Sequence, residues 1–204
     1  MKYVLRDAQL VQKYARTLRG VFSIADLKNL LDETNLVQLH RRIRRLQSEG
    51  ILERFVRGLY TTDEPDLGVL GMKLHEDSCV SLASALARHL MIGTVPSRTL
   101  FAVRPGRTRT YTGPVGSIAY AGIRKELMFG CEFIDGVRYA TREKALLDVL
   151  YFYQKGHRFY FDIYSDVNIQ RVNAAIVYDW LPAYHNPRFT TFVKAYLRDR
   201  VPGH

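Results

Sequence analysis

The feature that most restricts the fold of this chain is a basic amphipathic segment, residues 35–49, followed directly by two short extended runs. Leu36, Leu39, Ile43 and Leu46 are spaced three, four and three residues apart, so they form one apolar stripe when the segment is helical. At about 100° per residue, the opposite face carries a mostly polar set: Val37, Gln38, Arg41, Arg44, Arg45 and Ser48. The pattern predicts a helix that packs on one side and presents arginine on the other.

Two shorter helices are predicted before this segment. Asp7 is the expected N-cap of a first helix that runs to about Leu18 and ends at Gly20. Ser23 is the expected N-cap of a second helix, residues 24–31, whose apolar residues repeat at helical spacing. A short connection then leads to the basic helix.

A hairpin is predicted after the basic helix. The run ILERFVRGLYTT is rich in residues that favour strands, and Arg57 and Gly58 stand where a turn is needed. Helix, helix, basic helix and hairpin, in this order, are the parts of a winged helix-turn-helix, whose last helix enters the major groove of DNA. The sequence therefore predicts a winged helix-turn-helix DNA-binding domain at residues 1–62.

The distribution of charge favours double-stranded DNA as the partner of this domain. The formal net charge is +10, and residues 1–60 carry twelve Lys and Arg against six Asp and Glu. An isolated basic run is most often a solvated helix face, but between residues 35 and 52 only Glu49 is acidic, and a hairpin follows. The candidate DNA-binding residues are Thr34, Gln38, Arg41, Arg44, Arg45, Arg54 and Arg57.

The remaining residues predict a second domain, so that the whole chain is of the α+β class. Residues 63–77 are expected to hold a linker and a helix that leads into this domain, which covers residues 78–204. Ser78 is the expected cap of a helix over residues 79–91, and Val95 with Pro96 is expected to break the chain after it.

A small antiparallel sheet is predicted next. The segments between Arg98 and Ile134 alternate in polarity and are separated by Gly and Pro. Asp135 and Gly136 are expected to form a hairpin turn, and Thr141 is expected to cap an amphipathic helix. At least two more helices are predicted to close the chain.

Three segments of this second half resemble the AbiEi-type antitoxins of type IV toxin–antitoxin systems. They are VSLASALARHLMI, YATREKALLDVLYFY, and the closing IYSDVNIQRVNAAI with NPRFTTFVKAYL. The chain departs from the family pattern at Leu90, where Gly is common, and at Arg142, where Pro is common. The resemblance implies an amino-terminal winged helix that represses its own operon and a carboxy-terminal domain that neutralises a nucleotidyltransferase-like toxin.

The sequence contains no strong enzymatic motif. Glu132, Asp135, Glu143 and Lys144 come nearest to a nuclease centre, but Glu143 and Lys144 are adjacent at a helix start rather than two apart on one strand. Glu143 is expected to favour the helix dipole, and Lys144 to pair with Asp148. The histidines are scattered singly and no phosphate-binding glycine motif occurs, so we expect no metal, no cofactor and no enzymatic activity.

The remaining features are those of an ordinary cytoplasmic protein. Cys79 and Cys131 lack metal-binding spacing and are expected to be buried free thiols. His89 lies late in an apolar segment and is expected to be a hydrogen-bonded core residue. The sequence has neither a long apolar run nor a signal peptide, so we expect a cytoplasmic protein with no membrane contact.

Three functions are therefore weighed. The first is an antitoxin that binds repeats in its own promoter and opposes a nucleotidyltransferase-like toxin, directly or indirectly. The second is a plain winged-helix transcriptional regulator with a carboxy-terminal dimerisation or ligand module. The third, and weakest, is a nucleic-acid-processing enzyme.

Overall fold

Residues 2–61 form three helices and a three-stranded sheet in the computed structural model, which describes residues 2–93 and 96–200. The elements are α1 (Lys2–Ala15), β1 (Val21–Ser23), α2 (Ile24–Leu30), α3 (Leu36–Ser48), β2 (Glu53–Val56) and β3 (Leu59–Thr61). The strand order is β1-β3-β2, and both pairs are antiparallel. This amino-terminal unit has its own apolar core, which includes Phe22, Leu27, Leu39, Ile43 and Leu46.

Most local predictions for this unit are confirmed. Ser23 caps α2 through a capping box with Asp26. The hairpin turns at Arg57 and Gly58, and Gly58 has a φ of +87°, a backbone conformation that favours glycine.

The N-cap predicted at Asp7 is wrong. Helix α1 begins at Lys2, so Asp7 lies inside it, and its carboxylate binds the guanidinium of Arg42 instead of helix N–H groups. The sequence misled because an aspartate before an apolar run is the usual sign of a helix start. The helix also ends earlier than expected, at Ala15.

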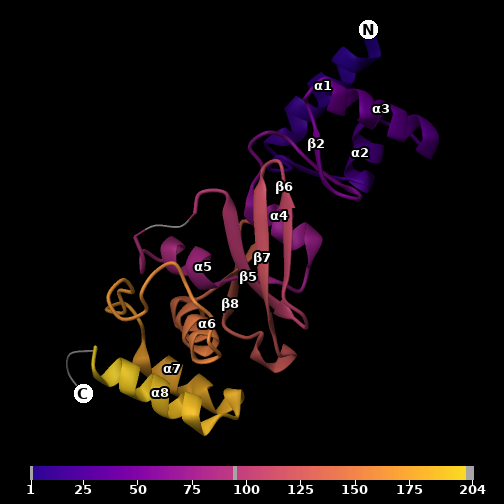
Figure 1. Ribbon diagram of the computed structural model, residues 1–204. Helices are drawn as coiled ribbons and strands as arrows, with labels where there is room; N and C mark the ends of the chain where they lie inside the picture. Colours follow the sequence, from indigo (N-terminus) through magenta and orange to yellow (C-terminus); the bar gives the residue numbers. More distant parts are fainter. Residues whose placement is uncertain (1, 94–95, 201–204) are drawn as a thin grey trace.

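The second unit is built on a six-stranded mixed sheet. Its elements are α4 (Leu67–Leu74), β4 (Cys79–Val80), α5 (Leu82–Arg88), β5 (Thr99–Pro105), β6 (Arg109–Gly113), β7 (Gly116–Ile123), η1 (Lys125–Leu127), β8 (Cys131–Ile134), β9 (Val137–Ala140), α6 (Arg142–Gln154), α7 (Ala174–Trp180), η2 (Leu181–Tyr184) and α8 (Pro187–Arg198). The described residues are therefore of the α+β class. Figure 1 shows the sheet between the amino-terminal helices at one end and α7 and α8 at the other.

The prediction of an antiparallel sheet is wrong. The strand order is β6-β7-β5-β4-β9-β8, and the pairs β5–β7 and β4–β9 are parallel. Parallel neighbours need a connection that crosses back, and β6 supplies it for β5 and β7 by pairing on the outer side of β7. The alternation of polar and apolar residues predicts a strand, but it does not predict which strand lies next to it. The hairpin turn at Asp135 and Gly136 is confirmed between β8 and β9.

The cap predicted at Ser78 is also wrong. The chain first forms the short strand β4, and α5 begins at Leu82 after Ser81. A buried strand and a buried helix are both apolar, so periodicity does not separate them here. Val95 lies outside the described residues, so the predicted break there is not described.

Helix α6 is the centre of the second core. Thr141 caps it as predicted, and its inner face packs with α5, α7 and α8. Lys144 and Asp148 form the predicted ion pair, but both side chains have no exposed surface. Ser81 also donates to Asp148, at 2.6 Å. The predicted surface pair is therefore a core feature.

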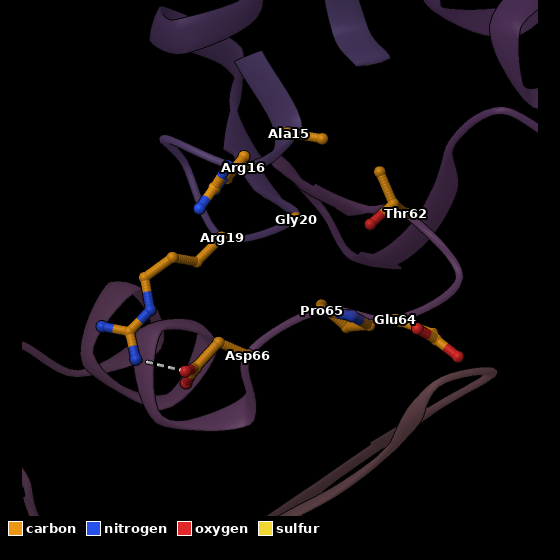
Figure 2. A pocket seen from close by; sticks show the side chains of 8 residues that line it. All are labelled: Ala15, Arg16, Arg19, Gly20, Thr62, Glu64, Pro65 and Asp66. Atoms are coloured by element: carbon orange, nitrogen blue, oxygen red, sulfur yellow. Dashed lines mark hydrogen bonds and ion pairs between the residues drawn. The ribbon is translucent and has the colours of Figure 1, made fainter. Parts of the chain in front are cut away.

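The two units meet through a third apolar cluster. Phe55 of β2 packs against the β6–β7 turn, where a side chain on Gly113 would collide with its ring. In Figure 2, Arg19 reaches across a hollow of about 470 Å³ at this junction to Asp66, the N-cap of α4. Lys73 of α4 binds Asp26 of α2 at 2.5 Å. The domain boundaries predicted at residues 62 and 77 stay a prediction. The third apolar cluster contains residues from both sides of them.

Within the described residues, no helix combines the length and the apolar character that a membrane crossing requires.

Candidate nucleic-acid interface

The start of α3 is fixed by a side-chain cap. Asn35 is the N-cap, and its Oδ1 accepts hydrogen bonds from the backbone N–H groups of Val37 at 2.9 Å and Gln38 at 3.2 Å. Such a cap contributes about 1 kcal/mol to helix stability. It fixes the register of the helix, and the register decides which side chains face outward.

The inner face of α3 holds the helix on the unit. Leu39, Ile43 and Leu46 are buried in the core. Leu36 was expected in the same stripe, but it is 57% exposed, because it lies in the first turn, beyond the edge of the core. The predicted stripe is therefore one residue shorter than the sequence suggested.

One arginine of α3 has a structural role that the sequence did not reveal. Arg42 donates two hydrogen bonds to the buried carboxylate of Asp7, at 2.6 and 2.9 Å, and a third to the carbonyl oxygen of Leu31 at 2.9 Å. The hydrogen bonds with Asp7 raise the pKa of Arg42 above its ordinary value. This bidentate pair ties α3 to α1 and to the end of α2.

The outer face of α3 presents the other arginines. Arg41, Arg44 and Arg45 are all exposed and line a hollow of about 380 Å³ together with Val37 and Ser48. Among residues 2–93 and 96–200, no carboxylate lies within ion-pair distance of any of the three. The face therefore carries positive charge that the described chain does not neutralise.

The other predicted DNA-binding residues are exposed but lie outside this hollow. Thr34 is in the connection before α3, and Gln38 is in the first turn of the helix. Arg54 lies on β2 and Arg57 in the hairpin turn. Val37, which was not among the predicted site residues, is 67% exposed in the same first turn as Gln38. An exposed apolar residue beside polar ones is suited to contact with a thymine methyl group.

Helix α2, which precedes α3, is held against α4 by the ion pair between Asp26 and Lys73. Burial alone raises the pKa of Asp26, but the hydrogen bonds from Lys73 and Ser23 outweigh this effect, so the pKa lies below its ordinary value. Asp26 thus stays ionised while it completes the capping box of α2 and binds Lys73 of α4. The orientation of the first unit is thereby linked to the second.

The four residues weighed as a nuclease centre are not assembled into one. Lys144 is wholly buried and bound to Asp148, and Glu143 accepts a hydrogen bond from the backbone N–H of Asn173 at 3.0 Å. Glu132 and Asp135 are exposed on the β8–β9 hairpin. In the described parts of the chain, no three His, Cys, Asp or Glu side chains gather closely enough to hold a metal ion.

The histidine and the cysteines occupy structural positions. Nε2 of His89 lies 2.8 Å from the carbonyl oxygen of Ala140, which agrees with the predicted hydrogen bond, but the residue is half-buried and does not belong to the core as predicted. Cys79 is buried and Cys131 half-buried, and both are free thiols. They come together in space although they are far apart in sequence, and a hydrogen bond between them raises the pKa of Cys79 and lowers that of Cys131.

A second group of arginines accompanies strands β5 and β6 and does not form one surface: Arg98, Arg104, Arg107 and Arg109. The carbonyl oxygen of Arg98 accepts from Ser117 at 2.8 Å, which places Arg98 beside the β6–β7 turn and hence near the hairpin of the first unit. Arg104 lies near the opposite end of β5, and a seven-residue strand is about 20 Å long. Arg107 and Arg109 lie beside that far end, next to Gly122 of β7.

Comparison with known proteins adds little. No protein-family model and no curated protein matches the chain. The crystal structure of the RV2827C protein from Mycobacterium tuberculosis matches with a TM-score of 0.49 and 14% identity, covering 100% of this chain and 83% of that one. A likeness at this level carries no argument about function.

Proposed function

We propose that the protein is an antitoxin and autorepressor, whose amino-terminal unit is a winged helix-turn-helix that binds double-stranded DNA in its own promoter. Its carboxy-terminal unit opposes a nucleotidyltransferase-like toxin, directly or indirectly. The first half of this proposal rests on the outward arginines of α3, and the second half on the resemblance of three segments to the AbiEi-type antitoxins.

The observation that carries the DNA-binding half is the uncompensated charge on one helix face. Arg41, Arg44 and Arg45 gather around one hollow on a single helix face, and none of them has a carboxylate within ion-pair distance among the described residues. Arg42, the one arginine of α3 that turns inward, is bound by Asp7. The helix thus separates a cation that holds the unit together from cations that are free to meet phosphates and base edges.

The expected binding mode follows from the positions of these side chains. Helix α3 enters the major groove, where arginine pairs with guanine and glutamine with adenine, so Arg41 and Gln38 are suited to base readout. Arg54 and Arg57, on the hairpin, are placed to contact the DNA backbone as a wing does. The apolar contact between Phe55 and the β6–β7 turn holds this hairpin in place.

The residues that support the antitoxin half are mostly internal. The motif segments form α5, α6, α8 and the start of α7, and Leu86, Leu147 and Leu150 have no exposed surface. These residues specify how the second unit packs, and they leave the chemistry of neutralisation to other, exposed residues. The toxin-directed role therefore needs a test in cells.

The DNA-binding proposal is tested with the protein's own upstream region in a fluorescence anisotropy titration. A variant with Arg41, Arg44 and Arg45 all changed to Ala should bind at least about 100-fold more weakly. The change of Arg158, Arg171 and Arg188 to Ala removes the same charge from the exposed surface of the second unit and serves as the matched control. Wild-type affinity in the α3 variant would overturn the proposal.

The antitoxin half is tested by rescue of growth. Cells that express the nucleotidyltransferase-like toxin encoded beside this gene receive either the wild-type protein or the α3 triple variant from an unrelated promoter. Equal rescue by the two proteins, at equal abundance, is expected if neutralisation lies in the second unit. Rescue by the wild type alone would mean that DNA binding itself protects, and rescue by neither would leave a plain regulator.

A further inference from the structure

Arg104 on β5 is a partly buried cation without an anionic partner. Its Nε is buried and has no hydrogen-bond partner, and its Nη1 lies 3.3 Å from Nε2 of His75. No carboxylate of the described chain lies within ion-pair distance of it. A buried donor without a partner costs free energy, and in native structures it is a sign of a water or an ion that belongs there.

Three other side chains converge on the same place. The hydroxyl of Tyr111 on β6 lies 3.0 Å from Nε2 of His75, the residue that ends α4. The guanidinium of Arg109 stacks over the Tyr111 ring, 4.7 Å from its centroid. Tyr120 of β7 packs edge-on against His75 and donates to the carbonyl oxygen of Gly71 at 2.7 Å. Strands β5, β6 and β7 and the end of α4 therefore build one polar cluster on the α4 side of the sheet.

The cluster holds an excess of positive charge. Burial, and after it the charge of Arg104, lower the pKa of His75, so the imidazole is neutral at physiological pH. Its Nε2 has one lone pair, which both Tyr111 and Arg104 approach. The acid that acts on the pKa of His75 is Asp77, which is exposed and forms no ion pair within the described residues. The guanidinium of Arg104 and the hydroxyl of Tyr111 thus share one weak acceptor, and the guanidinium of Arg109 adds a second positive charge beside them.

We propose that this cluster, formed by Arg104, Arg109, Tyr111 and His75, binds a phosphate group. A water molecule would accept a hydrogen bond but would leave both charges uncompensated, whereas a phosphate both accepts several hydrogen bonds and neutralises them. The planar guanidinium suits the oxygens of a tetrahedral oxyanion, and such charge-assisted hydrogen bonds are stronger than neutral ones. The site is distinct from the α3 face, and it gives the second unit the character of a ligand module.

Binding of phosphate to this cluster is tested by isothermal titration calorimetry of the whole protein with inorganic phosphate at constant ionic strength. Because the arginines of α3 could also attract phosphate, the titration is made in the variant that carries Ala at positions 41, 44 and 45. One-to-one binding is expected to persist in that background and to weaken by about ten-fold or more on Arg104→Gln or Arg109→Gln. Arg188→Gln, which removes an exposed charge from α8, should leave it unchanged.

Two further measurements keep the result interpretable. The first is the phosphate affinity of Arg104→Lys, which retains the charge but lacks the planar guanidinium group. The second is the melting temperature of each weak-binding variant, and a value near that of the wild type shows that the variant is folded. Tighter, Arg104-dependent binding of adenosine monophosphate than of free phosphate would support the proposal and identify a nucleotide as the source of the group. No binding to the α3 variant, or the same loss on Arg188→Gln, would overturn it and leave a water as the partner of Nε. Neither result depends on whether the protein binds DNA.

Discussion

Helices α3 and α6 are both 13 residues long, both capped by a polar side chain and both packed on the core of their unit, yet they place their cations in opposite environments. In α3, three arginines point outward and have no carboxylate partner among the described residues. In α6, Lys144 points inward and is bound to Asp148. The comparison separates two kinds of cation: the three arginines of α3 are exposed and unpaired among the described residues, and the lysine of α6 is buried and paired.

The largest loss of stability should come from breaking the buried ion pair between Lys144 and Asp148. Lys144→Ala leaves the carboxylate of Asp148 without its cation in the core, and the free energy of unfolding should fall by about 3–5 kcal/mol. Urea denaturation followed by circular dichroism measures the change.

The matched control removes both charges together. A double variant, Lys144→Met with Asp148→Leu, should lose much less stability than Lys144→Ala, because no unpaired charge remains in the core. Equal losses in the single and double variants would show that shape, rather than charge, makes Lys144 important.

A smaller effect is expected from single substitutions on the outer face of α3. Arg41→Ala or Arg45→Ala should weaken binding by about 1–3 kcal/mol at one base pair of the operator and leave the stability of the fold unchanged. Titration of a set of operators with single base changes identifies that base pair. A large loss of stability in either variant would contradict the division between binding and folding cations.

Arg42 tests the same division within α3 itself. Because it pairs with Asp7 on the inner side, Arg42→Ala and Asp7→Ala should each reduce stability, and the double-mutant cycle should show a coupling of about 1–2 kcal/mol. Thermal unfolding of the four proteins gives this value. Complete additivity of the two changes would mean that the pair contributes nothing to the packing of α1 on α3.

The smallest change in DNA affinity is expected from substitutions in the β2–β3 hairpin. Arg57→Ala, or Arg54→Ala, should weaken binding to all DNA sequences alike and lower the slope of log affinity against log salt by about one unit. The measurement is the same anisotropy titration at several salt concentrations. A loss confined to one operator sequence would instead place the hairpin in a groove, reading bases.

Local structure in the first unit was largely predictable from the sequence. The spacing of Leu39, Ile43 and Leu46 and the turn at Gly58 each depend on a few neighbouring residues, and both predictions agree with the structure. Asp7 was misread because its partner Arg42 is 35 residues away. A capping aspartate and a buried paired aspartate look the same when only their neighbours in the sequence are known.

The sequence by itself determined that residues 36–48 and 142–154 are helical, that Ser23 and Thr141 are caps and which side of α3 carries arginine, because these properties follow from patterns of a few residues. Only the tertiary structure decided that β5 and β7 run parallel, that Lys144 is buried and that Arg104 meets His75 and Tyr111. Arg104 and His75 are 29 residues apart, and His75 and Tyr111 are 36 apart. Contacts of this kind depend on how whole elements pack against one another, which no local pattern encodes.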